Sequence, residues 1–326
     1  MKKLTIAIPT YNGARTVQRT LESIFNQPFS INEVDVIVCN NCSTDGTLGI
    51  IKPFESRLKL FNNETNLGGD RNFQLCVERS ASEYVWIVGD DDFLREDAIE
   101  KVLQKIRDRQ YAAIFVNFSL YDVKSQMEVL PRYVAIERDI IAKGISSFLE
   151  HTTIAANFLS AVIHNKKCFE SVDATNYYGS CWLQFAVILD YVNDQETLII
   201  AEPYVANMGD SSDREFNRGG VAVKILSNLF TIVKSAKSPF IQQSVRNKTL
   251  DIIHQRLKYR ILSAKRLGLK VTPTLFKELQ YNFGSYRSFW PVDAVLLYTP
   301  NFIIDGIYFI YRLKPVNTFL TRYLFK

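Results

Sequence analysis

The chain has 326 residues, enough for one large domain or two modest ones, and its 47% apolar and 22% charged residues form an ordinary globular balance. No stretch of 18 or more residues lacks a charge, so the sequence indicates no membrane-spanning helix. The five cysteines share no spacing, and no second pair or nearby histidine completes a zinc site at Cys39 and Cys42, so we expect free thiols in the cytoplasm.

Strands and helices alternate through the first 120 residues. We interpret Leu4–Ile8 as a first strand and not as part of a signal peptide, because Pro9 and Asn12 follow so soon. The other predicted strands are residues 34–39, 58–61, 84–88 and 112–120, and the predicted helices are residues 14–26, 48–54, 70–80 and 96–108. This alternation predicts an α/β fold, a mostly parallel sheet with helices on both faces.

The pattern is less regular after residue 120. Residues 123–138 fit a hairpin or an extended excursion, and residues 140–149 fit a helix. The later predictions are a strand at 156–164, a helical turn at 166–171, a helix at 182–191 and a strand at 196–200. Residues 207–220 are polar and rich in turn formers, which predicts a mobile lid. We place the end of the first domain, residues 1–220, after this segment.

Three consecutive carboxylates end the most apolar strand. Asp90, Asp91 and Asp92 have apolar residues on both sides, so they are not a solvated acidic loop. Like charges at this spacing raise one another's pKa, and a divalent cation with oxygen ligands removes that cost. Because ligands of open α/β sheets bind at the carboxyl ends of the strands, the sequence predicts a metal–diphosphate site. The alternative is that the acids start the next helix, with Asp92 the best case.

Four loops follow strands in the first 95 residues and match one family in order and spacing. They are IAIPTYN (6–12), VCNNCSTDGT (38–47), NLGGDRN (66–72) and WIVGDDD (86–92). Together they resemble the nucleotide-sugar glycosyltransferases of family 2, especially those that build bacterial surface polysaccharides such as O-antigen. The resemblance covers the first third of the chain and, loosely, residues 96–205. It implies the GT-A fold. The C-terminal third lies outside the resemblance, and its residue pattern predicts a helical region.

The resemblance implies that ten residues contact the nucleotide sugar. They are Pro9, Thr10, Tyr11, Asn12, Asn40, Asn66, Gly68, Arg71, Asn72 and Asp90. Asn40 stands where the family usually has an aspartate that accepts a hydrogen bond from the base, and its amide can both donate and accept. We expect Arg71 to reach a phosphate rather than to form a surface ion pair. Asp45, beside Gly46, can be explained by the shape of the turn alone.

The resemblance also implies a bound Mn²⁺ or Mg²⁺ that neutralises the leaving nucleoside diphosphate. Gly89 stands where many relatives begin their acidic motif with Asp. Asp91 and Asp92 are therefore the predicted metal ligands, Asp91 counts as catalytic, and Asp90 faces the ribose or the metal.

Inverting members of this family need a general base for the acceptor hydroxyl, often an acid at a helix start in the second half of the domain. Residues 177–182, where that acid is expected, contain none. We predict Asp173 as the base and an inverting reaction, while retention without a base stays open. The other titratable candidates are His151, His164, Glu170 and Asp190.

Residues 221–326 differ from the rest in charge. They carry 17 Lys and Arg against 4 Asp and Glu, a net charge of +13, whereas residues 1–220 carry 22 against 30. Helices are predicted at 221–236, 240–267 and 273–283. Basic residues alternate with apolar ones in the helix 240–267 and accompany many aromatic residues at 286–326. This pattern predicts a second region that lies on an anionic membrane surface. Packing of the apolar faces on the first domain, with solvated charges, is the alternative.

These observations predict a metal-dependent transferase that moves a sugar from a nucleotide donor to a lipid-linked polysaccharide precursor on the inner face of the cell membrane. A metal-dependent nucleotidyltransferase is one alternative, but residues 9–15 supply only Gly13 and Arg15 of the phosphate loop it would need. A non-enzymatic nucleic-acid binder is the other, and it leaves the four loops unexplained. We therefore expect no nucleic-acid partner.

Overall fold

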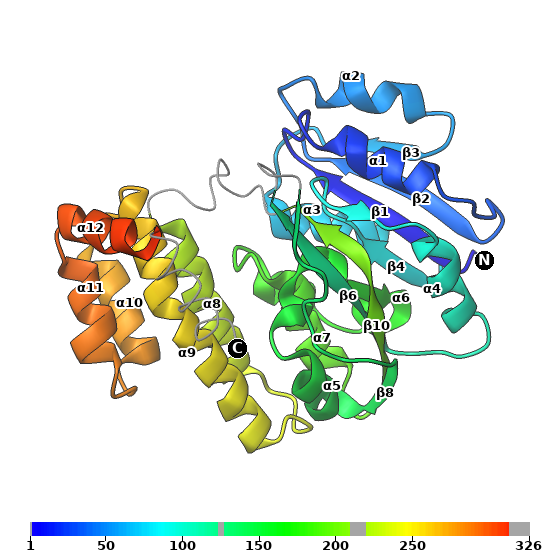
Figure 1. Ribbon diagram of the computed structural model, residues 1–326. Coiled ribbons are helices and arrows are strands. Elements are labelled where there is room, and N and C mark those ends of the chain that lie inside the picture. Colours follow the sequence, from blue (N-terminus) through cyan, green and yellow to red (C-terminus); the bar gives the residue numbers. More distant parts are fainter. Residues whose placement is uncertain (1, 123–126, 209–219, 313–326) are drawn as a thin grey trace. The chain divides into compact units, whose positions relative to one another are not determined.

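The computed structural model describes residues 2–122, 127–208 and 220–312. The chain divides into two compact units (Figure 1). Unit 1 comprises residues 1–210 and 232–249, and unit 2 comprises residues 211–231 and 250–326. Residues 209–219 of the predicted lid lie outside the described residues.

Unit 1 is built on one ten-stranded sheet with the order β3-β2-β1-β4-β9-β6-β10-β5, with β7 paired to β6 and β8 to β10. The strands are β1 (Leu4–Thr10), β2 (Val34–Asn40), β3 (Lys59–Asn62), β4 (Tyr84–Ile87), β5 (Phe93–Leu94), β6 (Ala113–Asp122), β7 (Met127–Leu130), β8 (Ile140–Lys143), β9 (Val162–Asn165) and β10 (Glu196–Asn207). Strands β3, β2, β1 and β4 are parallel to one another, and β6 is parallel to β10. The α/β prediction is confirmed.

The central strands are buried because helices cover the sheet. Every residue of β2 and β4 is buried, and Tyr84 and Trp86 are among the largest side chains with no exposed surface. The helices of unit 1 are α1 (Val17–Phe25), α2 (Thr47–Ile51), α3 (Gly69–Glu78), α4 (Ala98–Ile106), α5 (Gly144–Thr152), α6 (Lys166–Glu170) and α7 (Leu183–Tyr191). Short 3₁₀ turns are η1 (Lys52–Phe54), η2 (Ala155–Asn157), η3 (Leu159–Ala161) and η4 (Ala174–Tyr177). Helix α3 packs against β1 and β2, which sets its N-terminus beside the strand ends.

The prediction of a helix over residues 140–149 was wrong in its first half. Residues 140–143 form β8, which pairs antiparallel with β10, and the helix α5 begins only at Gly144. Gly144 has φ 78°, a conformation that breaks the strand sharply and favours glycine. The apolar residues at 140–143 therefore belong to a strand, and this strand is defined only by its pairing with β10.

Three other boundaries differ from the prediction. The strand expected at 156–164 is confined to β9, because the turns η2 and η3 precede it. Strand β10 continues to Asn207, with a register shift between Ile200 and Val205 that contains Pro203, which cannot donate a ladder hydrogen bond. The short strand β5 directly after the acids was not predicted, and it pairs with β10.

The predicted helical C-terminal region is confirmed. Its helices, coloured from yellow-green to red in Figure 1, are α8 (Val221–Ser235), α9 (Gln243–Arg266), α10 (Pro273–Phe283), the π-helical η7 (Phe289–Ala294), α11 (Val295–Tyr298) and α12 (Asn301–Arg312). In unit 2 the rings of Phe230 and Phe283 lie 4.5 Å apart. His254 stacks on Tyr286 at 3.9 Å and lies 3.1 Å from a buried carboxylate oxygen of Asp293. Unit 2 therefore has its own packed interior.

Candidate active site

The loops after β1 and β4 meet at the carboxyl edge of the sheet. Thr10 Oγ1 donates a hydrogen bond of 2.7 Å to Asp90 Oδ2, and both side chains are buried. A Cβ atom on Gly13 would lie 2.3 Å from the same Asp90 oxygen, so only glycine lets the first loop pass this carboxylate. The structure thus brings together Thr10 and Asp90, two of the residues predicted to contact the nucleotide sugar.

Asn12 joins the first loop to the second. Its backbone has φ 54°, its N–H donates to Ser43 Oγ at 2.9 Å, and its Oδ1 accepts from the Thr44 N–H at 2.8 Å. Tyr11 beside it is 45% exposed, so its ring is available to a ligand. Pro9 is half-buried in β1.

A network of asparagine side chains joins the second and third loops to α3. Asn41 Nδ2 donates to Asn66 Oδ1 at 2.8 Å, and Asn63 Nδ2 donates to the Oδ1 atoms of Asn41 and Asn72, at 3.0 Å each. Asn72 Nδ2 donates to the Cys39 carbonyl at 2.9 Å. Asn66 and Asn72 were predicted to contact the nucleotide, and here they fix the loops. Asn41 and Asn63 were missed, although the density of asparagines after β2 and β3 was visible in the sequence.

Asn40 is enclosed by its own loop. It is 2% exposed, its Oδ1 accepts from Ser43 Oγ at 2.5 Å, and its Nδ2 donates to Asn62 Oδ1 at 3.0 Å. Both halves of the amide are thus engaged with protein groups. A hydrogen bond from Asn40 to a nucleobase stays a prediction.

Asp45 shapes the turn, as the sequence allowed. Its carboxylate accepts from the N–H groups of Thr47 at 3.0 Å and Ala14 at 3.1 Å. Burial opposes ionisation, but the hydrogen bonds from Thr47 and Ala14 outweigh it and lower the pKa of Asp45.

The acidic loop closes on Ser160, a residue that the sequence did not single out. Ser160 Oγ donates to Asp92 Oδ2 at 2.5 Å and accepts from the Gly89 N–H at 2.9 Å. A Cβ on Gly89 would lie 2.9 Å from Asp92 Oδ2 and 3.0 Å from Asp91 Oδ1, so a side chain at position 89 would have to displace these carboxylates. Asp92 is buried and Asp91 is half-buried, so Asp91 is the more accessible of the two predicted ligands.

The described residues contain no group of three or more His, Cys, Asp or Glu side chains arranged to enclose a metal ion. One carboxylate oxygen of Asp90 accepts a hydrogen bond from the Thr10 hydroxyl, and one of Asp92 accepts a hydrogen bond from the Ser160 hydroxyl. This donor set fits an ion that takes one or two protein carboxylates and completes its shell with phosphate oxygens and water, as Mg²⁺ does. Asp91, with a second oxygen from Asp90 or Asp92, would hold such an ion.

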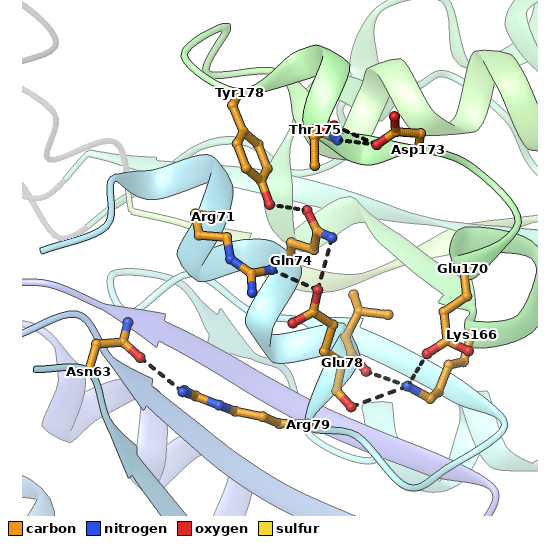
Figure 2. Close-up of polar contacts among 11 residues, drawn as sticks. Asn63, Arg71, Gln74, Glu78, Arg79, Lys166, Glu170, Asp173, Thr175 and Tyr178 are labelled. Carbon is orange, nitrogen blue, oxygen red and sulfur yellow. Dashed lines mark hydrogen bonds and ion pairs between the residues drawn. The ribbon is translucent and has the colours of Figure 1, made fainter. Parts of the chain in front are cut away.

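Arg71 makes the surface ion pair that we had ranked second to a phosphate contact. Its Nη1 donates to Glu78 Oε1 at 2.7 Å, and the pair raises the pKa of Arg71 (Figure 2). Gln74 also donates to this Glu78 oxygen, at 2.9 Å, and accepts from the Tyr178 hydroxyl at 2.5 Å. Tyr178 thus lies over α3, while a contact between Arg71 and a phosphate stays a prediction.

Asp173, the predicted base, caps the turn η4. Its Oδ1 accepts from the N–H of Thr175 at 3.1 Å and from the Thr175 hydroxyl at 2.5 Å (Figure 2). These bonds lower the pKa of Asp173, which makes it a weaker proton acceptor. The geometry therefore gives Asp173 a structural role, and no observation tests a catalytic one.

The other candidate bases are also engaged. Glu170 accepts from Lys166 at 2.6 Å, and Asp190 accepts from the Tyr177 hydroxyl. His164 is fully buried and lies 2.8 Å from the Tyr191 hydroxyl, and burial lowers its pKa to about 3. His151 Nδ1 lies 2.8 Å from the Ser147 carbonyl one turn back in α5.

Asp70 brings a carboxylate to the turn that lacks an acid. It follows Gly68 and Gly69 at the start of α3, and its Oδ2 accepts from the Cys181 N–H at 3.0 Å. Residues 177–182 are the segment where the family resemblance led us to expect an acid, and they contain none. The sequence could not reveal this contact, because 111 positions separate its partners.

Comparison with known proteins relates this chain to a family of glycosyltransferases. The family model described as glycosyl transferase family 2 matches residues 5–162. The match supports a family 2 glycosyltransferase. Abequosyltransferase RfbV of Salmonella typhimurium is 26% identical over 260 residues, which cover 72% of this chain and 74% of that protein. Poly(ribitol-phosphate) beta-N-acetylglucosaminyltransferase TarS of Staphylococcus aureus is 31% identical over 103 residues, which cover 31% of this chain but only 18% of TarS.

Solved structures share the fold of this chain. Residues 1–349 of S. aureus TarS, in complex with UDP-GlcNAc, match with a TM-score of 0.62 and 16% identity over 88% of this chain and 81% of that one. The mannosyltransferase PcManGT of Pyrobaculum calidifontis, in complex with GDP-Man and Mn²⁺, matches with a TM-score of 0.57 and 14% identity over 99% of this chain and 84% of that one. The predicted GT-A fold is confirmed.

Proposed function

We propose that this chain transfers a sugar, with inversion, from a nucleotide donor to a lipid-linked precursor of a bacterial surface polysaccharide such as O-antigen. The observation that carries the proposal is the meeting of the first and fourth loops through Thr10 and Asp90 at the carboxyl edge of the sheet. Ligands of open α/β sheets bind at this edge. The likeness to an abequosyltransferase and to a poly(ribitol-phosphate) transferase supports the substrate class.

Different loop residues contact different parts of the nucleotide-sugar donor. Tyr11 offers an exposed aromatic face to the base, and Gly68 has open space at its Cα, so the backbone of its loop can approach a ribose or phosphate. Asp91 is the accessible carboxylate for Mn²⁺ or Mg²⁺, with Asp90 or Asp92 as the second ligand. When bound, the ion would neutralise charge on the leaving diphosphate.

In this proposal, unit 2 contacts the membrane that carries the lipid-linked acceptor. The exposed apolar side chains of its helices include Trp290 (48% exposed), Tyr298 (63%) and Phe302 (75%). The net charge of residues 221–326 complements an anionic membrane surface. No helix in the described ranges is long and apolar enough to span a bilayer. The charge and the exposed rings support a peripheral position on the inner face of the membrane, beside a lipid-linked acceptor.

The test is release of nucleoside diphosphate from UDP-, GDP-, CDP- and dTDP-sugars by the full chain with Mn²⁺, compared with Asp91→Asn. We expect release from donors of one base, accelerated by an extract of lipid-linked glycans, and at least about a hundredfold slower in the variant. Glu202→Gln makes the same chemical change in a surface ion pair with Arg132 and serves as the matched control. Equal rates in wild type and Asp91→Asn, or no release from any donor, would contradict the proposal.

A further inference from the structure

Asp70 lies where the start of α3 meets the turn before α7, two segments of unit 1 that are far apart in the sequence. It sits in the first turn of α3, and its Oδ2 accepts the Cys181 N–H at 3.0 Å just before α7 begins. Gly179 and Cys181 have φ values of 79° and 66°, so the turn is wound to present successive N–H groups to the carboxylate. This geometry holds the carboxylate of Asp70 at the start of α7.

Open space borders this contact on both segments. A Cβ added to Gly68, Gly69 or Gly179 would meet no atom within 4 Å. Tyr178 on the turn is 40% exposed, and Asp70 itself is half-buried. The carboxylate is therefore partly desolvated yet next to space that a ligand can enter, which is the setting that a proton acceptor requires.

The other acids at this edge of the sheet are assigned to other contacts. Asp90 and Asp92 accept hydrogen bonds from Thr10 and Ser160, and Asp91 is the accessible metal ligand of the proposed function. Asp45 has a lowered pKa, as does Asp173 beyond the edge.

Asp70 differs from Asp45 and Asp173 in its affinity for a proton. Burial raises the pKa of Asp70, although backbone N–H groups of the turn act in the opposite direction. The titratable groups on the two segments are Arg71 and Glu78, which pair with each other, Cys76 on α3, and Tyr177, Tyr178 and Cys181 on the turn, where the Tyr177 hydroxyl donates to Asp190. No charged side chain besides these lies on residues 177–182 or in the first turn of α3.

We propose that Asp70 is the general base for the acceptor hydroxyl, supplied by α3 to a turn that has no acid of its own. In the step, the acceptor oxygen forms a bond to the anomeric carbon, and the bond from that carbon to the diphosphate oxygen breaks. The electron pair leaves with the diphosphate, and the hydroxyl proton passes to the Asp70 carboxylate. This inference rests on the proposed function and names a residue that the four-loop pattern leaves without a role.

The test compares Asp70→Asn, Asp70→Ala and Asp70→Glu with wild type. An asparagine oxygen can still accept the Cys181 N–H but cannot take the proton. We expect Asp70→Asn to release nucleotide at least about a hundredfold more slowly while its thermal shift with nucleoside diphosphate and Mn²⁺ is kept. The fall of wild-type kcat at low pH should vanish in Asp70→Asn and return, at reduced rate, in Asp70→Glu. Glu202→Gln is again the matched control and should behave as wild type.

A role in fixing the turn alone predicts another result. In that case Asp70→Asn would keep its rate and its decline at low pH, and only Asp70→Ala would lose activity together with melting temperature. That result would overturn the inference, and so would loss of activity in Asp173→Asn with Asp70→Asn fully active. If wild type released no nucleotide from any donor, the proposed function would fail, and this inference with it.

Discussion

Single glycines determine how closely the acidic loop can be approached. Gly13 and Gly89 leave room for carboxylate oxygens that any Cβ would displace. The family resemblance implied that Thr10 and Asp90 both contact the nucleotide sugar, and the structure places them within hydrogen-bond distance of each other. The sequence could not predict Ser160 or the Asp70 contact with Cys181, because those pairs form only when distant segments pack together.

Replacing Gly13 tests the close approach to Asp90. Gly13→Ala must displace the Asp90 carboxylate and break its buried hydrogen bond to Thr10, so we expect the free energy of unfolding to fall by about 1–3 kcal/mol. Gly49→Ala, in α2 with no atom within 4 Å of the added Cβ, is the control. It should leave stability unchanged or raise it by up to about 1 kcal/mol. Urea denaturation measures both, and equal stability of the two variants would refute the close contact.

At the scale of elements, periodic segments were predicted well and edge segments poorly. Helix α1 buries Val17, Leu21 and Ile24 on one face, which is the spacing read from the sequence. Strand β8 has no such signal, because its two isoleucines and an alanine fit helix and strand equally. Its identity comes from pairing with β10, which no local pattern contains.

Strand β2 is fixed to its neighbourhood by an ion pair at its start. Asp35 accepts from Lys2 and Lys59, each at 2.7 Å. Burial raises the pKa of Asp35, but the two lysines outweigh it and the net pKa is lowered. The resulting stability is therefore present above the ordinary pKa of about 4 and is lost as the pH falls through the lower folded value.

Asp35→Asn should accordingly be less stable than wild type by about 1 kcal/mol at pH 7. The difference should be smaller at pH 3, because protonation of Asp35 removes its attraction for the lysines. Thermal melts of both proteins at the two pH values measure this. A difference that is the same at both pH values would mean that the ion pair does not contribute through charge.

At the scale of the whole molecule, charge and apolar exposure both single out the C-terminal region. Residues 221–326 hold 17 of the 39 Lys and Arg residues but 4 of the 34 Asp and Glu residues. Unit 2 also exposes the aromatic side chains of Trp290, Tyr298 and Phe302. The sequence predicted the basic character and the helices, while the exposure of these rings needed the packed unit.

We expect the full chain to co-sediment with vesicles that contain anionic phospholipid, and salt to weaken the binding. The double change Trp290→Ala and Phe302→Ala should reduce binding severalfold without altering the nucleotide-dependent thermal shift. Ile31→Ala removes a comparably exposed apolar side chain from unit 1, where Ile31 is 74% exposed, and should have no effect. Equal binding to neutral and anionic vesicles would contradict the proposed membrane surface.

The central claim is that the four loops and the acids form one metal-dependent nucleotide site. Thermal shifts of wild type and Asp91→Asn, with UDP, GDP, CDP or dTDP and with or without Mn²⁺, test it most directly. We predict that one nucleotide raises the wild-type melting temperature only with Mn²⁺, by the equivalent of about 2.7 kcal/mol at a hundred times Kd, and that Asp91→Asn abolishes the shift. No shift with any pair, or a shift that persists in Asp91→Asn, would contradict the account.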